Sequence, residues 1–324
     1  MKAVYLEKAA VSRGDLSLEP LTKLAETRVF ENTTEADKYE HIGDAEMVYA
    51  NKIIFDEEAF ERLPQLKYIG VCATGYNVID LEAAKRHGVT VTNVPAYSTE
   101  SVAQLAWGFI IESASRISAH NESVHKGDWV RSETFCYWNY PLMELCGKSL
   151  GIIGFGNIGR RVAEIALAFR MKVLVHTAHP EKYAEDAMAK GESGLRFVPL
   201  EEIWKDADII SLHCPLNRDT EKLICRETIA KMKDGVILIN VSRGGLVHEQ
   251  DLADALRSGK VAAAAADVVS VEPMQADNPL LSAPNLCITP HLAWASLEAR
   301  KRLIDVVAAN AAAFLRGEKQ NVLV

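Results

Sequence analysis

Short apolar runs alternate with amphipathic stretches along the first 95 residues or so of the chain. Some of the intervening stretches carry apolar residues at helical spacing, as in Glu57–Leu63 and Asp80–His87. The runs with the length and residue types of β-strands are Lys2–Leu6, Thr27–Phe30, Glu46–Ala50, Lys67–Val71 and Val89–Asn93. Strands that alternate with helices predict a parallel sheet with right-handed crossovers. We therefore expect this segment to form an α/β domain.

The same alternation returns in the second half of the chain. The strands expected there are Leu150–Ile153, Lys172–His176, Asp208–His213, Gly235–Asn240, Val261–Asp267 and Leu286–Thr289. The helices expected beside them include Arg160–Phe169, Glu227–Lys233 and Gln250–Ser258. This pattern predicts a second parallel sheet covered by helices.

One long helix is expected between the two halves, from about Glu100 to His120, with Ser98 or Thr99 as its N-cap. An irregular, aromatic stretch follows it at His125–Trp138. A last helix, rich in alanine, is expected from about Ser296 to Leu315.

The first strand of the second half leads into a glycine turn and then a helix. Gly154, Gly156 and Gly159 follow the uncharged strand in the spacing G-x-G-x-x-G. The first glycine permits a tight turn, the second lets a pyrophosphate approach the backbone, and the third lets helix and strand pack closely. The free N–H groups at the start of the helix attract phosphates. Strand, turn and helix together predict a dinucleotide site.

Length, composition and charge narrow the class of protein. The chain has 324 residues, 48% of them hydrophobic, which suits two domains with full cores. Its net charge is −8, with acidic and basic residues interspersed, which disfavours nucleic acid or an anionic membrane as a partner. No apolar run approaches the length of a membrane span. The N-terminus has the pattern of a first strand and not of a signal peptide.

The six cysteines do not form C-x-x-C pairs, and their spacing matches no metal site. We expect six reduced, mostly buried thiols in a cytoplasmic protein, and no bound metal.

Polar residues follow three of the expected strands in the second half. Arg243 comes after the strand that ends at Asn240, and Asp267 ends the next strand, with Glu272 beyond it. His291 lies just past the last strand. Ligands of open α/β sheets bind at the carboxyl ends of the strands, so we expect these side chains to face one crevice. Each residue taken alone is more often a solvated charge, an ion pair, a helix cap or a structural residue.

Together these segments resemble the D-isomer-specific 2-hydroxyacid dehydrogenases over essentially the whole chain. The matching motifs are G-F-G-N-I-G at 154–159, H-C-P-L-N-R-D-T at 213–220, N-V-S-R-G at 240–244, D-V-V-S-V-E-P at 267–273 and T-P-H-L-A-W-A-S at 289–296. The stretch 73–80 looks like the family's substrate loop. The resemblance implies two doubly wound parallel-sheet domains. These are a Rossmann dinucleotide-binding domain at 99–292 and a flavodoxin-like substrate domain at 1–98 and 293–324.

The resemblance also implies roles for the strand-end residues in hydride transfer between a nicotinamide cofactor and a 2-oxo acid. His291 would act as general acid, with Glu272 fixing the tautomer of its ring. Arg243 would hold the substrate carboxylate and polarise the carbonyl. Backbone N–H groups around Thr74 and Gly75 would bind that carboxylate, and closure of the domains would exclude water.

Further cofactor contacts follow from the same resemblance. They are the backbones of Asn157 and Ile158 at the pyrophosphate, Cys214 and Pro215 on the adenosine side, and Val241, Ser242 and Asp267 around the nicotinamide. For Cys214 and Pro215, simple loop packing is an equal alternative.

The chain departs from the family pattern where NAD-binding members place an acid for the ribose diol. The expected acid falls at Thr177, and no arginine stands there to bind a 2′-phosphate instead. His176, His179 and Lys182 are close in sequence and could bind such a phosphate weakly. The sequence favours NAD, with NADP or use of both as the alternative.

The segment around Trp294 resembles the glycerate dehydrogenase (hydroxypyruvate reductase) branch, so the expected substrate is hydroxypyruvate or glyoxylate. Trp294 would line the substrate pocket or simply pack at the domain boundary. Lactate-like and phosphoglycerate dehydrogenases are the alternative enzymes, whereas Glu272 argues against a formate dehydrogenase. A dinucleotide-sensing, corepressor-like binding protein is the alternative outside enzymology. The family resemblance implies a homodimer formed through the helix near 100–120.

Overall fold

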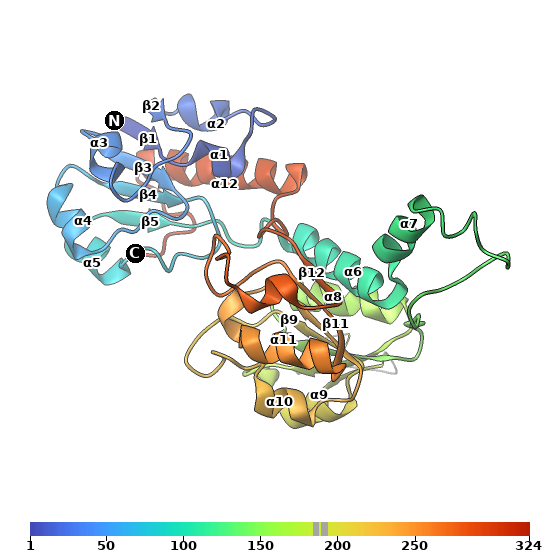
Figure 1. Cartoon of the computed structure of the whole chain (residues 1–324). Helices are drawn as coiled ribbons and strands as arrows, with labels where there is room; N and C mark the ends of the chain where they lie inside the picture. The colour runs from blue at the N-terminus through green and yellow to red at the C-terminus, as the bar shows by residue number, and fades with distance from the viewer. Residues whose placement is uncertain (184–187, 189–193) are drawn as a thin grey trace. The chain divides into compact units, whose positions relative to one another are not determined.

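The computed structural model describes residues 1–183, 188 and 194–324, and the chain divides into two compact units. Unit 1 contains Met1–Ser98 and Trp294–Val324, and unit 2 contains Thr99–Ala293. Figure 1 follows the chain through both units by colour. Ala293 thus belongs with the segment that precedes it, and Trp294 begins the return to unit 1.

Unit 1 is built on a five-stranded parallel sheet in the order β2-β1-β3-β4-β5. The strands are β1 (Lys2–Tyr5), β2 (Glu26–Val29), β3 (Met47–Ala50), β4 (Tyr68–Val71) and β5 (Thr90–Thr92). The helices are α1 (Lys8–Val11), α2 (Glu19–Thr22), α3 (Lys38–Ile42), α4 (Glu57–Arg62), α5 (Leu81–Arg86) and α12 (Leu297–Leu315). The strand order is that of flavodoxin-like folds.

Alternation along the strands of unit 1 fills a separate core on each face of its sheet. Val4 and Val48 pack in one buried cluster with residues of α4 and α5. Their neighbours Tyr5 and Tyr49 pack in the other cluster, with residues of α2 and α12. Successive side chains of a strand point to opposite faces, so both faces of this sheet are covered.

Unit 2 contains a seven-stranded parallel sheet in the order β12-β11-β10-β9-β6-β7-β8. The strands are β6 (Ser149–Ile153), β7 (Lys172–His176), β8 (Leu195–Phe197), β9 (Ile209–Leu212), β10 (Val236–Asn240), β11 (Val261–Ala266) and β12 (Leu286–Ile288). The α-helices are α6 (Thr99–Ser115), α7 (Ile117–His125), α8 (Asn157–Ala168), α9 (Leu200–Asp206), α10 (Arg226–Lys231) and α11 (Glu249–Ser258). The sheet order reverses at β6, as in Rossmann folds, which confirms the predicted fold class.

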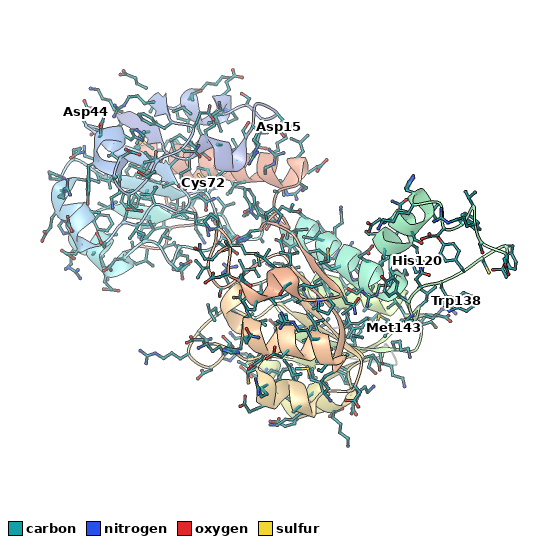
Figure 2. The ribbon with its side chains drawn as sticks, in the orientation of Figure 1. Asp15, Asp44, Cys72, His120, Trp138 and Met143 are labelled. Carbon is teal, nitrogen blue, oxygen red and sulfur yellow. The ribbon has the colours of Figure 1, made fainter. Side chains whose placement is uncertain are left out.

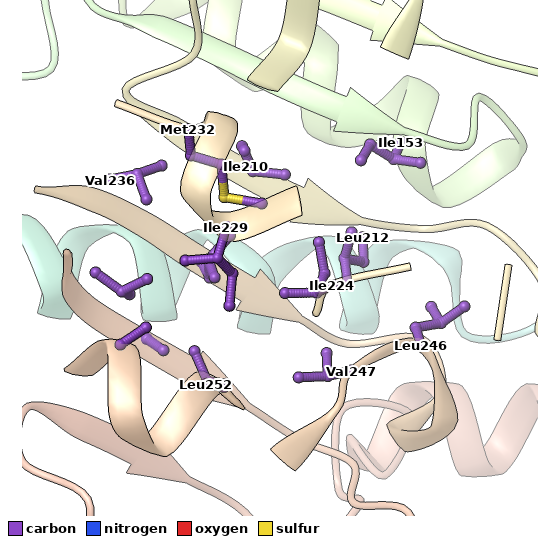
Figure 3. Packing of buried hydrophobic residues seen from close by; sticks show 14 of the residues in the cluster. Ile153, Ile210, Leu212, Ile224, Ile229, Met232, Val236, Leu246, Val247 and Leu252 are labelled. Atoms are coloured by element: carbon purple, nitrogen blue, oxygen red, sulfur yellow. The ribbon is translucent and has the colours of Figure 1, made fainter. Parts of the chain in front are cut away.

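The core of unit 2 joins β9, β10 and β11 to the helices α10 and α11 (Figure 3). Ile210 and Leu238 contribute from the strands, Ile229 from α10 and Leu252 from α11. This packing fixes the carboxyl ends of the strands that carry the predicted polar residues.

The single helix predicted at Glu100–His120 is wrong. The chain forms two helices, α6 and α7, separated by Arg116, whose φ of 53° is left-handed. At the break between α6 and α7, the Arg116 side chain donates to the carbonyl of Ala262 in β11. Figure 1 shows α7 and the segment after it projecting from the body of unit 2.

The prediction of mostly buried cysteines is also wrong, although all six are free thiols. Only Cys72 (labelled in Figure 2) and Cys214 are buried, whereas Cys136 and Cys146 are exposed. Both exposed cysteines lie in the segment between α7 and β6, which has no regular hydrogen-bonded structure to enclose them.

Among the described residues, none of the helices combines the length and apolarity that crossing a membrane requires.

Candidate active site

The glycine turn between β6 and α8 brings two backbones into close contact. Gly154 has a φ of 98°, and a Cβ there would lie 2.5 Å from the backbone nitrogen of Cys214. A Cβ on Gly159 would lie 2.1 Å from the carbonyl oxygen of Gly154. Any larger residue at either position would push α8 or the loop after β9 away from β6. Glycine at these two positions therefore lets the start of α8 pack closely against the carboxyl end of β6.

Gly156 differs from its neighbours because a Cβ there would meet open space. Gly156 is the N-cap of α8, and both it and Asn157 are exposed. The first turn of this twelve-residue helix contains no acidic residue, so its N–H groups face no competing carboxylate from that turn. Open space above free N–H groups at a helix start suits the pyrophosphate of a dinucleotide. The residues present therefore fit the predicted cofactor.

Thr177 directly follows β7, the strand next to β6 in the sheet. The Thr177 hydroxyl accepts a hydrogen bond from the backbone nitrogen of His179 at 3.4 Å, and His179 Nδ1 lies 3.2 Å from Glu181 Oε1. The position at which a ribose-binding acid was expected thus holds a neutral hydroxyl, with an exposed histidine–glutamate pair just beyond it.

Three adjacent strands carry the remaining polar residues. Because β12, β11 and β10 are neighbours in a parallel sheet, their carboxyl ends lie side by side. Arg243, Asp267 and His291 follow these three ends, so the fold brings all three to one edge of unit 2. Neither this edge nor the rest of the described chain has three or more His, Cys, Asp or Glu side chains grouped as metal ligands.

His291 and Glu272 form a hydrogen-bonded pair. His291 Nδ1 lies 2.7 Å from Glu272 Oε2, and the two side chains are 31% and 33% exposed. The other carboxylate oxygen of Glu272 accepts from the backbone nitrogen of Val269 at 3.3 Å. With Nδ1 facing a carboxylate, the proton on that nitrogen is fixed and Nε2 is left for chemistry. Partial exposure leaves the pair open to a small molecule.

Asp267 holds the loop on which His291 stands. One oxygen of this buried carboxylate accepts from the Thr289 hydroxyl at 2.5 Å and from the Leu292 nitrogen at 2.8 Å, and the other accepts from the Ala293 nitrogen at 2.8 Å. The backbone carbonyl of Asp267 accepts from the backbone nitrogen of His291 at 2.8 Å. His291 itself has a φ of 52°, a backbone conformation that needs such support in a residue other than glycine.

Arg243 is exposed at the end of β10, and its Nη1 donates to the carbonyl of Ser242 at 2.8 Å. The side-chain amide of Asn240, which is buried, donates to the Arg243 carbonyl at 2.9 Å and so fixes the backbone there. The rest of the guanidinium offers donors in the planar arrangement that binds a carboxylate.

A second histidine near the same edge has a different character. His213 follows β9, and burial lowers its pKa to about 3, so it is neutral at any physiological pH. Burial also raises the pKa of the Cys214 thiol to about 11, which leaves it protonated and unreactive. The carbonyl of Cys214 accepts from the Ser242 hydroxyl at 2.6 Å, so the loops after β9 and β10 are joined. His291 is thus the better candidate for proton transfer.

The other predicted substrate residues belong to unit 1. The Thr74 hydroxyl donates to the carbonyl of Val94 at 2.8 Å, which orders the loop that carries Gly75. Trp294 packs with the buried cluster around Tyr5 and Leu303 and meets the Tyr97 ring edge-on, with centroids 6.4 Å apart. Trp294 therefore packs within unit 1, and its predicted role in the substrate pocket stays a prediction.

Two residues that sequence reasoning missed support the predicted ones. Thr289 donates to Asp267, and Asn240 holds the backbone of Arg243. Both stand at or just past a strand end, and that position was the available signal. The neighbour that each side chain contacts cannot be inferred from its position at a strand end.

The chain is similar to known proteins along its whole length. Residues 107–293 match the family described as D-isomer specific 2-hydroxyacid dehydrogenase, NAD binding domain. A hydroxypyruvate reductase of Blautia hydrogenotrophica is 47% identical, over 100% of this chain and 99% of the relative. A glycerate dehydrogenase of Methylorubrum extorquens is 38% identical, over 99% and 98%. A solved structure of an acyclic imino acid reductase with NADPH and D-Arg has a TM-score of 0.84 and 29% identity, over 100% of both chains.

Proposed function

The chain belongs to the D-isomer-specific 2-hydroxyacid dehydrogenases, and we propose that it interconverts hydroxypyruvate and D-glycerate, with glyoxylate as a further 2-oxo acid substrate. The prediction of the family and of a nicotinamide-dependent oxidoreductase is confirmed. The observation that carries the proposal is the His291–Glu272 pair at the edge of a dinucleotide-binding sheet.

Reduction of a 2-oxo acid requires a hydride at the carbonyl carbon and a proton at the carbonyl oxygen. A nicotinamide dinucleotide held at the glycine turn before α8 would supply the hydride. His291 donates the proton from Nε2, while Glu272 at Nδ1 stabilises the imidazolium before transfer. In the oxidative direction the neutral ring takes the proton back. The Asp267 contacts keep the imidazole at one place through both directions.

Arg243 completes the proposed site by holding the substrate carboxylate. Its exposed guanidinium can form two parallel hydrogen bonds to that group. The carbonyl oxygen gains negative charge as the hydride arrives, so a fixed cation stabilises the transition state more than the ground state. The backbones of Thr74 and Gly75 are proposed as further contacts of the carboxylate. Trp294 is proposed as a pocket residue for the substrate's C3 hydroxymethyl group.

The cofactor contacts inferred from the family are kept as part of the proposal. Asn157 and Ile158 supply N–H groups at the pyrophosphate, and Val241 and Ser242 border the nicotinamide. Asp267 is proposed to reach the carboxamide as well as the histidine loop. For Cys214 and Pro215 the two alternatives, contact with the adenosine and packing of the loop, are both retained.

NAD and NADP are both compatible with the neutral Thr177 side chain, and we propose NAD as the preferred cofactor. Replacing Thr177 with aspartate should raise the ratio of kcat/KM for NADH over NADPH by about tenfold or more, because a carboxylate binds the ribose diol and repels a 2′-phosphate. The ratio is measured at saturating hydroxypyruvate. Thr22→Asp, which adds the same charge at an exposed position of α2 in unit 1, is the control. Equal ratios in both variants would mean that Thr177 does not face the ribose.

The substrate is tested with purified protein, NADH and a panel of hydroxypyruvate, glyoxylate, pyruvate and 3-phosphohydroxypyruvate. We expect kcat/KM to be highest with hydroxypyruvate. A preference for pyruvate would favour a lactate-like enzyme, and one for the phosphorylated acid a phosphoglycerate dehydrogenase. No oxidation of NADH with any of the four would favour the corepressor-like binding role.

We further propose that the enzyme is a cytoplasmic homodimer that forms through α6, α7 and the segment after them. Large apolar side chains on that segment are exposed, among them Trp129, Val130, Phe135 and Trp138. Trp138, labelled in Figure 2, lies on the part of the segment that leads back to the body of unit 2. Apolar area of this kind on an extension suits burial against a second copy of the chain.

The proposed cytoplasmic location is supported by the six free thiols, which are in keeping with a reducing compartment.

A further inference from the structure

The turn that carries Glu272 is held from two sides by one short segment of unit 2. This segment, Gly244–Glu249, links the end of β10 to the first residue of α11. Gly244 at one end of this segment and Glu249 at the other both contact the turn Val269–Glu272. The contacts at Gly244 are steric, and those at Glu249 are hydrogen bonds.

At the Gly244 end, the two backbones touch. A Cβ on Gly244 would lie 1.9 Å from the carbonyl carbon of Val269 and 2.4 Å from the backbone nitrogen of Ser270. The turn therefore rests directly on the backbone next to Arg243. A residue larger than glycine would displace the turn, and with it Glu272.

At the Glu249 end, both carboxylate oxygens are engaged by the turn and the chain beyond it. Oε1 accepts from the backbone nitrogen of Ser270 at 2.8 Å, and Oε2 accepts from the Ser270 hydroxyl at 2.8 Å. Oε2 also accepts from the side-chain amide of Asn278 at 2.9 Å. Two of these three donors belong to Ser270, so the carboxylate of Glu249 holds the turn directly. Hydrogen bonds to an ionised acceptor are also the stronger kind.

The segment that makes these contacts is itself anchored in the core. Leu246 and Val247 are buried and pack with Ile224, as Figure 3 shows. The backbone nitrogen of Ile224 donates to Leu246, and that of His248 donates to Ile224, at 2.9 and 2.8 Å. Glu249 therefore extends from a rigid support, which is what a precise catalytic geometry needs.

We propose that Glu249 is a positioning residue that sets the carboxylate of Glu272 against His291. The turn passes the constraint on directly, because Ser270 follows Val269, whose nitrogen binds the other oxygen of Glu272. The carboxylate of Glu249 contacts Ser270 and Asn278, so it acts on the histidine through the turn. This inference rests on the proposed function, in which the His291–Glu272 pair transfers the proton.

The test is Glu249→Gln in the full-length enzyme. Glutamine keeps the shape but turns one oxygen into an NH₂ group, which then faces either the Ser270 nitrogen or the Asn278 amide, both donors. We expect kcat/KM for hydroxypyruvate reduction to fall about tenfold, with the fall concentrated in kcat. The loss of activity with rising pH should also begin at lower pH, because a displaced Glu272 supports the imidazolium less well. NADH affinity should not change.

Asp254→Asn is the matched control, since Asp254 lies on the same helix but binds Gln250 and Arg257 instead of the turn. A pH profile for Glu249→Gln that superimposes on that of Asp254→Asn would overturn the inference. Ser270→Ala removes one hydrogen bond and keeps Glu249, so it should give a smaller shift in the same direction if Glu249→Gln does not fold. A wild-type profile for a folded Ser270→Ala would then overturn the inference.

His291→Asn separates failure of the inference from failure of the proposed function. If that variant retains turnover, the proton-transfer role is wrong, whatever Glu249 does. If that variant is inactive and Glu249→Gln behaves as the control does, only the positioning role is wrong.

Discussion

Replacing His291 with asparagine is expected to lower kcat for hydroxypyruvate reduction by ~10²- to 10⁴-fold, the range that a positioned general acid contributes. Asparagine cannot deliver a proton at neutral pH, but it tolerates the left-handed backbone that His291 adopts. The fold and the dinucleotide site should therefore survive. Steady-state rates give the loss of kcat, and fluorescence titration with NADH checks that the affinity for cofactor is unchanged.

His87→Asn is the control for this substitution. His87 is the C-cap of α5 in unit 1 and pairs with Glu57, and it belongs to none of the proposed substrate or cofactor contacts. It should be fully active. Turnover of His291→Asn within a few-fold of His87→Asn would remove His291 from the reaction, and His213, neutral through burial, could not replace it as an acid.

Replacing Arg243 with alanine is expected to lower kcat/KM by ~10²- to 10³-fold, comparable to the loss of a donor that stabilises developing negative charge. Both constants should change. KM rises because the substrate carboxylate loses its bidentate partner, and kcat falls because the carbonyl is less polarised. Initial rates over a range of hydroxypyruvate concentrations separate the two effects.

The matched control is Arg257→Ala, which removes an arginine of α11 that binds Asp254 and the carbonyl of Pro279. This variant should keep both constants. If Arg243→Ala changed KM without kcat, Arg243 would bind the substrate without assisting the reaction. If neither constant changed, Arg243 would lie outside the site.

Much of the fold followed from periodicity, because the strands of both sheets are short apolar runs between amphipathic helices. All eleven predicted strands occur, with ends that differ by a residue or so. β8 was missed because it has three residues, of which only Leu195 is buried, so it lacks a recognisable apolar run. The break at Arg116 was missed because arginine in a left-handed conformation leaves no trace in the hydrophobic pattern.

The candidate site was predictable as far as strand ends and motifs allowed. Asp267 and His291 could be placed at neighbouring strand ends from sequence order alone. The sequence could not show that Asp267 binds the histidine loop, since this depends on backbone N–H groups that any residue carries. Glu249 had no signal either, because an acid in the first turn of a helix is favourable for general electrostatic reasons.

The central claim is that one imidazole, paired with a carboxylate, donates the proton in reduction and accepts it in oxidation. The most direct test is the pH dependence of kcat/KM in both directions, with hydroxypyruvate and NADH and with D-glycerate and NAD. Reduction needs protonated His291, so its kcat/KM should fall as pH rises, whereas oxidation needs the neutral ring and should lose activity as pH falls. Profiles with limbs in these opposite senses are predicted, and profiles that run in the same sense would contradict the account.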